Sequence, residues 1–204
     1  MKPTIATQAA PFPGIGDPRW RIAPGTHLLT DVPHHESPNQ DARPEDAIID
    51  AVVVHAISLP PGEFGGGFIE ALFCNELPAG AHPYFAGIAD LRVSAHLCIY
   101  RGGEVSQFVP FDRRAWHAGE SCYDGRTACN DFTIGIELEG CDDQPFTDAQ
   151  YQALGGVGRA LMARYPDIVP ERFVGHSDIA PGRKTDPGQH FDWLRLLDEL
   201  EYQR

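Results

Sequence analysis

Residues 132–139 alternate strictly between apolar and other side chains, in the order FTIGIELE. Because successive side chains of a strand point to opposite faces, this pattern predicts a strand with one face in the core. Gly135 and Glu137 fall on the opposite face of that strand. The missing side chain of Gly135 predicts space beside Glu137 for a ligand or for another backbone.

A buried central strand is predicted at residues 48–55, where the run IIDAVVVH is dense in β-branched residues. It ends at His55, a position at which open α/β sheets place their ligands. Three further extended segments are expected, over residues 91–100, 105–109 and 172–174. The glycines in residues 101–104 predict a tight turn between the first two of these segments.

Helical spacing of apolar residues appears in three places. Residues 68–73 predict a short helix, and the capping box that begins at Thr147 opens a helix that runs to about Tyr165. A last amphipathic helix is expected over residues 191–202. Its predicted inward side chains are Leu194, Leu197 and Leu200.

The overall composition is that of a globular protein built as one domain. The chain has 204 residues and a net charge of −13, from 29 acidic and 16 basic residues, which argues against nucleic acid or anionic membranes as partners. No run reaches the roughly 18 apolar residues that span a bilayer, and the N-terminus does not resemble a signal peptide. The five cysteines form no C-x-x-C pair, which is typical of free thiols in a reducing compartment. We therefore expect a cytoplasmic protein.

The chemistry-bearing residues concentrate in residues 174–188, with the sequence VGHSDIAPGRKTDPG. Its proline and glycine residues predict an irregular loop. His176 offers an imidazole nitrogen and Asp186 a carboxylate, an incomplete set for a catalytic zinc ion, which takes three protein ligands and leaves one position open. In an extended segment Lys184 would face the same side as Asp186.

His55 is the candidate third ligand, although a hydrogen-bonded core histidine is the ordinary interpretation of such a residue. Two imidazoles and a carboxylate, from His55, His176 and Asp186, would suit zinc with a water in the fourth position. Glu137 either faces bulk water or acts as a general base on that water. Lys184 would donate to the oxyanion of a tetrahedral intermediate. Together these groups would make an amide hydrolase.

Five ordered segments resemble a known enzyme family, and they are 53–66, 91–96, 114–119, 134–140 and 175–188. They resemble the AmpD-type 1,6-anhydro-N-acetylmuramoyl-L-alanine amidases, relatives of the phage lysozyme-like amidases and the peptidoglycan recognition proteins. The resemblance runs from about Ser37 to Trp193. It implies an α/β (α+β) fold with a mixed central sheet flanked by helices. It also implies an amidase domain at 37–204, preceded by a largely irregular extension at 1–36.

The resemblance implies one zinc ion per chain, held by His55, His176 and Asp186. It assigns proton transfer to Glu137 and stabilisation of the transition state to Lys184. It also implies substrate contacts by Tyr84, Arg92, Trp116 and Arg183. The two arginines would meet carboxylates of the stem peptide. The tryptophan would line the groove, although by itself a tryptophan beside a histidine is equally a core side chain.

The implied reaction is hydrolysis of the amide between the lactyl group of 1,6-anhydro-N-acetylmuramic acid and L-alanine. A monomer that acts on a small muropeptide is expected. One position departs from the family pattern, since Ala56 stands where we expect an asparagine, so a substrate contact is lost or moved. Two other functions stay open: a peptidoglycan-binding module without catalysis, and an amidase that acts on intact cell wall. The complete ligand set disfavours the first, and the lack of an export signal disfavours the second.

Overall fold

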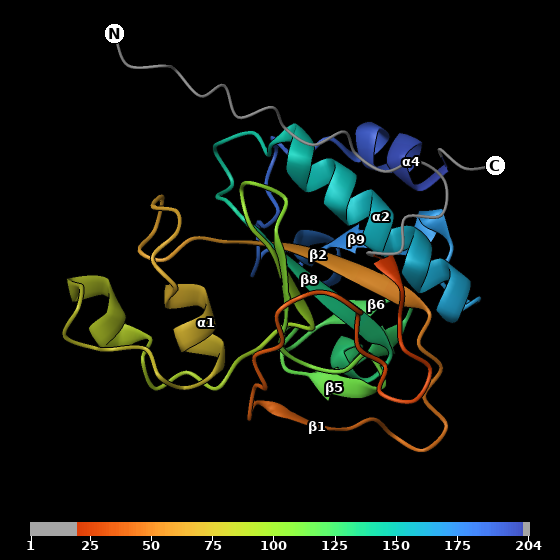
Figure 1. The fold of residues 1–204 in the computed structure, drawn as a ribbon, viewed down its shortest axis with the longest axis horizontal. Coiled ribbons are helices and arrows are strands. Elements are labelled where there is room, and N and C mark those ends of the chain that lie inside the picture. Colours follow the sequence, from red (N-terminus) through yellow and green to blue (C-terminus); the bar gives the residue numbers. More distant parts are fainter. Residues whose placement is uncertain (1–19, 202–204) are drawn as a thin grey trace, which may run out of the picture.

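The computed structural model describes residues 20–201 and is organised around a central five-stranded sheet (Figure 1). The strand order is β4-β3-β8-β2-β9. In that order the strands span Val105–Gln107, Leu97–Ile99, Thr133–Glu139, Ala51–Ile57 and Phe173–Gly175. Neighbouring strands are parallel except β3 and β4, which are antiparallel. The predicted fold class, with a mixed central sheet, is therefore confirmed.

Helices α2 (Asp148–Arg164) and α4 (Trp193–Glu201) cover one face of the sheet (Figure 1). The predicted capping box is present, because the Thr147 side chain accepts from the Gln150 backbone N–H while the Gln150 side chain accepts from the Thr147 backbone. Gly158 allows the two helices to approach closely, since a Cβ at this position would collide with the side chain of Leu200. Helix packing thus accounts for a glycine that weakens α2 as an isolated helix.

The predicted inner face of the last helix is wrong at Leu194, which is 76% exposed. The buried leucines of α4 are instead Leu196 and Leu200, at 0% and 4% exposure, and Leu197 is half-buried. At 100° per residue, Leu194 lies about 120° away from Leu200 around the helix axis, whereas Leu196 lies about 40° away. A spacing of four residues therefore defines the buried side of this short helix.

The opposite face of the sheet is covered by short elements and long connections. These are α1 (Phe68–Phe73), the 3₁₀ helices η2 (Pro83–Gly87) and η3 (Cys129–Asp131), and the small sheets β1–β5 (Gln40–Ala42 with Arg113–Ala115) and β6–β7 (Cys122–Tyr123 with Arg126–Thr127). The predicted short helix is confirmed as α1. A further 3₁₀ helix, η4 (Pro170–Arg172), precedes β9.

The strand expected over residues 91–100 is much shorter than predicted, because β3 covers only Leu97–Ile99. Just before it, the Ser94 backbone N–H donates to the carbonyl of Trp116 at 3.1 Å and its hydroxyl donates to the carbonyl of Asn39 at 2.7 Å. These partners lie outside the central sheet. The first half of the segment therefore belongs to a loop between the sheet and β1.

Residues 20–36 lie against the body of the protein. Trp20 packs on the apolar cluster beneath α2, where it contacts Gly156, and Ile22 forms an isolated bridge with Leu29. The rest of the predicted extension, residues 1–19, lies outside the described residues, so its boundary at residue 36 stays a prediction. None of the helices within residues 20–201 is both long and apolar enough to cross a bilayer.

Candidate metal centre and active site

The carboxyl ends of two neighbouring parallel strands carry the two predicted histidine ligands. β2 and β9 pair through Val54 and Gly175, so the residues that follow, His55 and His176, lie side by side at one edge of the sheet. His176 begins α3 (His176–Ile179), a single helical turn. The expectation of a wholly irregular loop is wrong here, because the first residues after β9 complete one turn before the prolines and glycines begin.

Three potential ligand atoms converge at this edge. His55 Nδ1 lies 2.9 Å from His176 Nδ1, and both nitrogens lie 3.1 Å from Asp186 Oδ2. His55 and His176 are only 2% and 3% exposed. Within residues 20–201, these three residues form the one group of His, Cys, Asp and Glu side chains arranged to hold a metal ion. The structure thus brings together residues that are up to 131 positions apart in the sequence.

The outer nitrogens of both rings contact other protein groups. His176 Nε2 lies 3.2 Å from the carbonyl oxygen of Ala118. A carbonyl only accepts, so Nε2 carries the hydrogen, and Nδ1 of the neutral ring is left with a lone pair. His55 Nε2 lies 2.9 Å from His117 Nδ1. Burial lowers the pKa of His55 to about 4, so its ring is neutral near pH 7.

The donor set fits a zinc-like divalent cation. Two neutral imidazole nitrogens and one carboxylate oxygen are the ligand types of catalytic zinc sites with an open position. Lone pairs that face one another at such short separations repel, and a cation between them removes this repulsion.

Glu137 lies directly beside the ligand group, because it is the registered partner of His55 on β8. Its Oε2 atom is buried and has no hydrogen-bond partner within the described part of the chain. Burial raises the pKa of Glu137 well above its usual value, and the negative charge of Asp186 adds to this effect while Lys184 opposes it. A buried carboxylate oxygen without a partner is costly, and such groups mark sites of function.

A cavity of about 440 Å³ opens above the ligand group. Its lining includes the predicted ligands and the side chains Glu137, Lys184, Tyr84 and Trp116. One wall is apolar and is formed by Leu72, Phe73, Ile88, Leu91 and Val93. Ala56 also lines the cavity, and it offers no side-chain hydrogen bond where we expected an asparagine. The cavity therefore combines a polar floor with an apolar side.

The two predicted substrate-binding arginines lie outside this lining. The Arg183 Nη2 group donates to the carbonyl oxygens of Ala118 and Glu120, at 2.6 and 2.5 Å. It therefore fastens the loop that contacts His176. Arg92 is exposed, and its closest polar side-chain contact is Asn75 Oδ1, at 3.5 Å from Nη1. Contact of either arginine with substrate stays a prediction.

His117 is a half-buried site residue that the sequence analysis did not single out. Its ring stands edge-on to that of His55, with the centroids 5.1 Å apart. The space left by Gly135 holds this ring, since a Cβ there would collide with it. The prediction that a ligand or a backbone fills the space is therefore wrong. The available signal was the pair of Trp116 and His117, from which only the tryptophan was considered.

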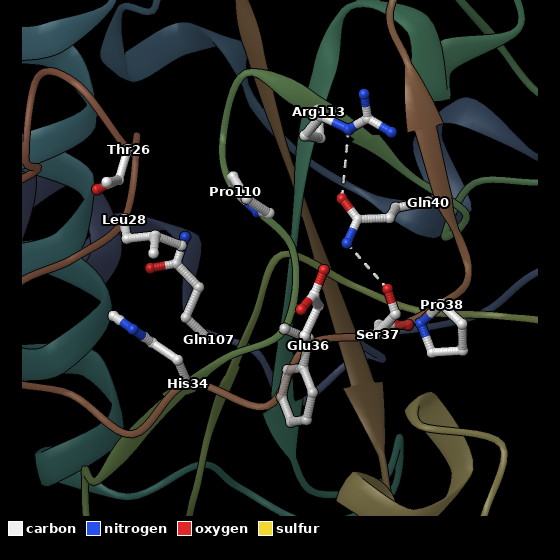
Figure 2. A pocket seen from close by; sticks show the side chains of 11 residues that line it. Thr26, Leu28, His34, Glu36, Ser37, Pro38, Gln40, Gln107, Pro110 and Arg113 are labelled. Atoms are coloured by element: carbon white, nitrogen blue, oxygen red, sulfur yellow. Dashed lines mark hydrogen bonds between the residues drawn. The ribbon is translucent and has the colours of Figure 1, made fainter.

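A larger cavity, of about 920 Å³, lies elsewhere and shares no lining residue with the first (Figure 2). It lies between residues 26–40 and residues 107–113. Figure 2 shows Gln40 between Ser37 and Arg113, donating to the carbonyl of the first at 2.9 Å and accepting from the guanidinium of the second at 3.4 Å. The amide of Gln107 is also fully engaged, with the Leu29 N–H and the Val109 carbonyl. This cavity lacks the converging ligand atoms of the smaller one.

Comparison with known proteins gives concordant matches. The family described as N-acetylmuramoyl-L-alanine amidase matches residues 44–189. The 1,6-anhydro-N-acetylmuramyl-L-alanine amidase AmpD of Citrobacter freundii is 62% identical over 160 residues, which cover 78% of this chain and 85% of the relative. A crystal structure of AmpD superposes with a TM-score of 0.83 at 56% identity and covers 86% of this chain and 97% of that one. A structure of the amidase AmiD of Escherichia coli superposes with a TM-score of 0.57 at 32% identity, and the match covers 77% of this chain and 60% of that one. That structure is a complex with the substrate anhydro-N-acetylmuramic acid-L-Ala-D-γ-Glu-L-Lys.

Proposed function

Because the chain belongs to the N-acetylmuramoyl-L-alanine amidase family, we propose that it hydrolyses the amide between the lactyl group of 1,6-anhydro-N-acetylmuramic acid and L-alanine. The products are the anhydro sugar and the free peptide, as expected for an enzyme of cell-wall recycling. The observation that carries this proposal is the convergence of His55, His176 and Asp186 in the cavity that also contains Glu137 and Lys184.

One zinc ion per chain is the proposed cofactor, held by His55 Nδ1, His176 Nδ1 and Asp186 Oδ2. When bound, zinc supplies a Lewis acid that makes hydroxide available near neutral pH and polarises a carbonyl. Three protein ligands would leave the fourth position of a tetrahedral zinc ion for a water or the substrate. Burial lowers the pKa of His55, so its imidazole is neutral near pH 7 and able to act as a ligand.

Glu137 is the proposed proton-transfer group. Oε2 would accept a proton from the attacking water and deliver it to the amide nitrogen as the carbon–nitrogen bond breaks. The absence of a hydrogen-bond partner for Oε2 within residues 20–201 supports this role, because the atom is available to a water or a substrate. The raised pKa of Glu137 supports it as well, since it brings the carboxyl group closer to the pH at which the reaction runs.

Lys184 is the proposed electrostatic stabiliser. Its ammonium group would donate a hydrogen bond to the carbonyl oxygen of the scissile amide as that oxygen gains negative charge. Two observations support the assignment: Lys184 lines the same cavity as Asp186, and its positive charge acts on the pKa of Glu137.

The rest of the cavity suits a substrate with an apolar sugar face and a polar peptide. Tyr84 and Trp116 offer aromatic surfaces to the sugar, and Tyr84 is 46% exposed beside the apolar wall. Arg92 would meet a stem-peptide carboxylate at the outer end of the cavity. Arg183 would bind a stem-peptide carboxylate only if that carboxylate displaced one of the two backbone carbonyls to which Arg183 donates.

A direct experiment tests the proposal. The purified protein is incubated with soluble anhydro-muropeptide, with and without a chelator, and the products are identified by mass. We expect release of free peptide that stops with the chelator and returns when zinc is restored. Binding of the muropeptide without cleavage would instead support a peptidoglycan-binding module. Faster release from intact sacculi than from the soluble substrate would support an amidase of the cell wall.

Two further expectations from the sequence stay predictions, namely the cytoplasmic location and the monomeric state. Fractionation of cells tests the first. Light scattering on the purified protein tests the second.

A further inference from the structure

We propose that His117 is a positioning residue, which orients the ligand His55 through a hydrogen-bond relay that ends at the backbone carbonyl of Cys129. The inference rests on the proposed metal centre and adds to it a side chain that would not itself touch metal or substrate. The relay runs from Cys129 through the hydroxyl of Thr133 and the ring of His117 to His55.

The direction of the relay follows from its buried end. Thr133 Oγ1 lies 2.7 Å from the carbonyl oxygen of Cys129, which can only accept, so the hydroxyl donates its one hydrogen there. His117 Nε2 lies 3.3 Å from the same Oγ1. Because the hydroxyl hydrogen is already used, Oγ1 accepts from His117, and Nε2 of His117 carries a hydrogen.

This assignment continues into the metal centre. In the neutral ring of His117, Nδ1 is then an acceptor, and it lies 2.9 Å from His55 Nε2. His55 therefore donates from Nε2 and keeps a lone pair on Nδ1, the atom that faces His176 and Asp186.

Packing holds the relay in place. Gly135 leaves the space that the His117 ring fills. Asn130 Oδ1 accepts from the backbone N–H groups of His117 and Ala118, at 3.1 and 2.8 Å. The next residue contacts the second histidine ligand, because the carbonyl of Ala118 accepts from the outer nitrogen of His176. Consecutive residues therefore contact both ligands, His117 through its side chain and Ala118 through its backbone.

A histidine is well suited to this position because its two ring nitrogens lie on different sides of a rigid ring. One nitrogen can accept from His55 while the other donates to Thr133. Groups that fix the outer nitrogen of a metal-binding histidine set its tautomer and orientation, and their loss typically costs about 10- to 100-fold in metal affinity. We expect this range for loss of the relay.

The test measures zinc affinity of the full chain by competition with a chromophoric chelator, together with the absorption spectrum of the cobalt-substituted protein. His117→Phe keeps an aromatic ring but removes the acceptor, and should weaken zinc binding about 10- to 100-fold and change the cobalt bands. His117→Asn restores an acceptor close to the position of Nδ1 and should recover part of the affinity. His35→Phe is the matched control, since His35 contacts Phe108 away from the site, and it should leave both readouts unchanged.

An unchanged zinc affinity and cobalt spectrum in His117→Phe would overturn the proposal, even if the melting temperature falls, because His117 would then be merely structural. If that variant does not fold, Thr133→Val removes the hydroxyl at nearly constant volume. It should weaken zinc binding by a few-fold, and wild-type affinity in Thr133→Val would equally overturn the relay. A wild-type protein that binds no zinc would refute the metal centre itself. That result is distinct from an unchanged affinity in either variant, which would refute only the relay.

Discussion

The two faces of β8 lie in different chemical environments, although they alternate along one strand. On one face Ile134, Ile136 and Leu138 are fully buried in the apolar cluster that α2 and α4 cover. On the other face Thr133 binds His117 and Glu137 lines the cavity. The first face requires only apolar contact, whereas each polar group of the second requires its own partner.

This difference determines how each face is stabilised. Burying apolar area is favourable without directional constraints, so the face against α2 tolerates approximate complementarity. Burying imidazoles and a carboxylate is unfavourable unless hydrogen bonds or ions satisfy them. The polar face therefore depends on the relay through His117. At the place where we propose the chemistry, Glu137 Oε2 has no hydrogen-bond partner within residues 20–201.

The largest effect is expected from Asp186→Ala, which removes one ligand from the polar face. We expect zinc to be lost and turnover to fall by roughly 10⁴-fold or more, since the remaining histidines provide only two ligands. Metal analysis of the purified variant and the muropeptide assay measure both effects. Asp142→Ala, which alters the same cavity outside the ligand group, should keep its zinc. Full zinc occupancy in Asp186→Ala would exclude Asp186 as a ligand.

Glu137→Gln should separate catalysis from metal binding on the same face. The amide keeps the shape of the side chain but cannot take up the proton, so turnover should fall roughly 10²- to 10⁴-fold while zinc is retained. Glu139→Gln is the matched control two residues along β8. The Glu139 carboxylate accepts from the backbone N–H groups of Gly65 and Arg101 and does not line the cavity. Wild-type turnover in Glu137→Gln would contradict the assignment.

Lys184→Met removes the ammonium group and keeps most of the side-chain length. Loss of one donor to a developing oxyanion typically costs about 10²- to 10³-fold in turnover, and zinc content should not change. Arg195→Met, which removes a cation paired with Asp148 away from the site, provides the comparison for a general charge effect. Equal turnover of Lys184→Met and Arg195→Met would exclude the proposed role.

Ile136→Ala tests the apolar face. It should lower the free energy of unfolding by about 2–5 kcal/mol through lost burial and a residual cavity, while the folded fraction keeps its zinc. Leu194→Ala is the control from α4, since that leucine is 76% exposed and its loss should change stability by less than about 0.5 kcal/mol. Denaturant unfolding measures both values. A similar cost for the two variants would contradict the assigned inner face of α4.

The last prediction concerns acid, where the effect of each single group is smaller than those of the substitutions above. Burial lowers the pKa of His55 to about 4 and of His96 to about 3, and lowers that of His117 as well. Unfolded histidines titrate near pH 6.5, so the stability from these neutral rings is complete above that pH and is lost as pH falls toward 4. Each histidine changes the free energy of unfolding by up to roughly 1.4 kcal/mol per pH unit. The raised pKa of Glu137 acts in the opposite direction, but it is a single group. Unfolding of the zinc-free protein between pH 6.5 and 5 should show falling stability, and a flat profile would contradict it.

Local patterns were sufficient to predict much of the fold. The alternation of residues 132–139 gave β8 and its two faces, and the capping box at Thr147 gave the start of α2. Strand ends and loop composition also indicated His55, His176 and Asp186, which the structure brings together, although their roles as ligands stay predictions.

What the sequence did not predict depends on contacts between distant segments. The segment before β3 is a loop because Ser94 finds partners at Trp116 and Asn39, which no local pattern reports. The pair of Trp116 and His117 pointed to this loop but not to a role for His117. Its position becomes informative only when β8 places Thr133 and Gly135 beneath its ring.

Gly135 shows what this arrangement implies for tolerance to substitution. It has no side chain to bind an ion or touch a sugar, yet any residue larger than glycine there would push His117 out of place, and its backbone N–H also donates to His96. In a saturation library we expect this codon to be as intolerant as those of the ligands themselves. Ranking positions by their distance from the reacting atoms would undervalue it.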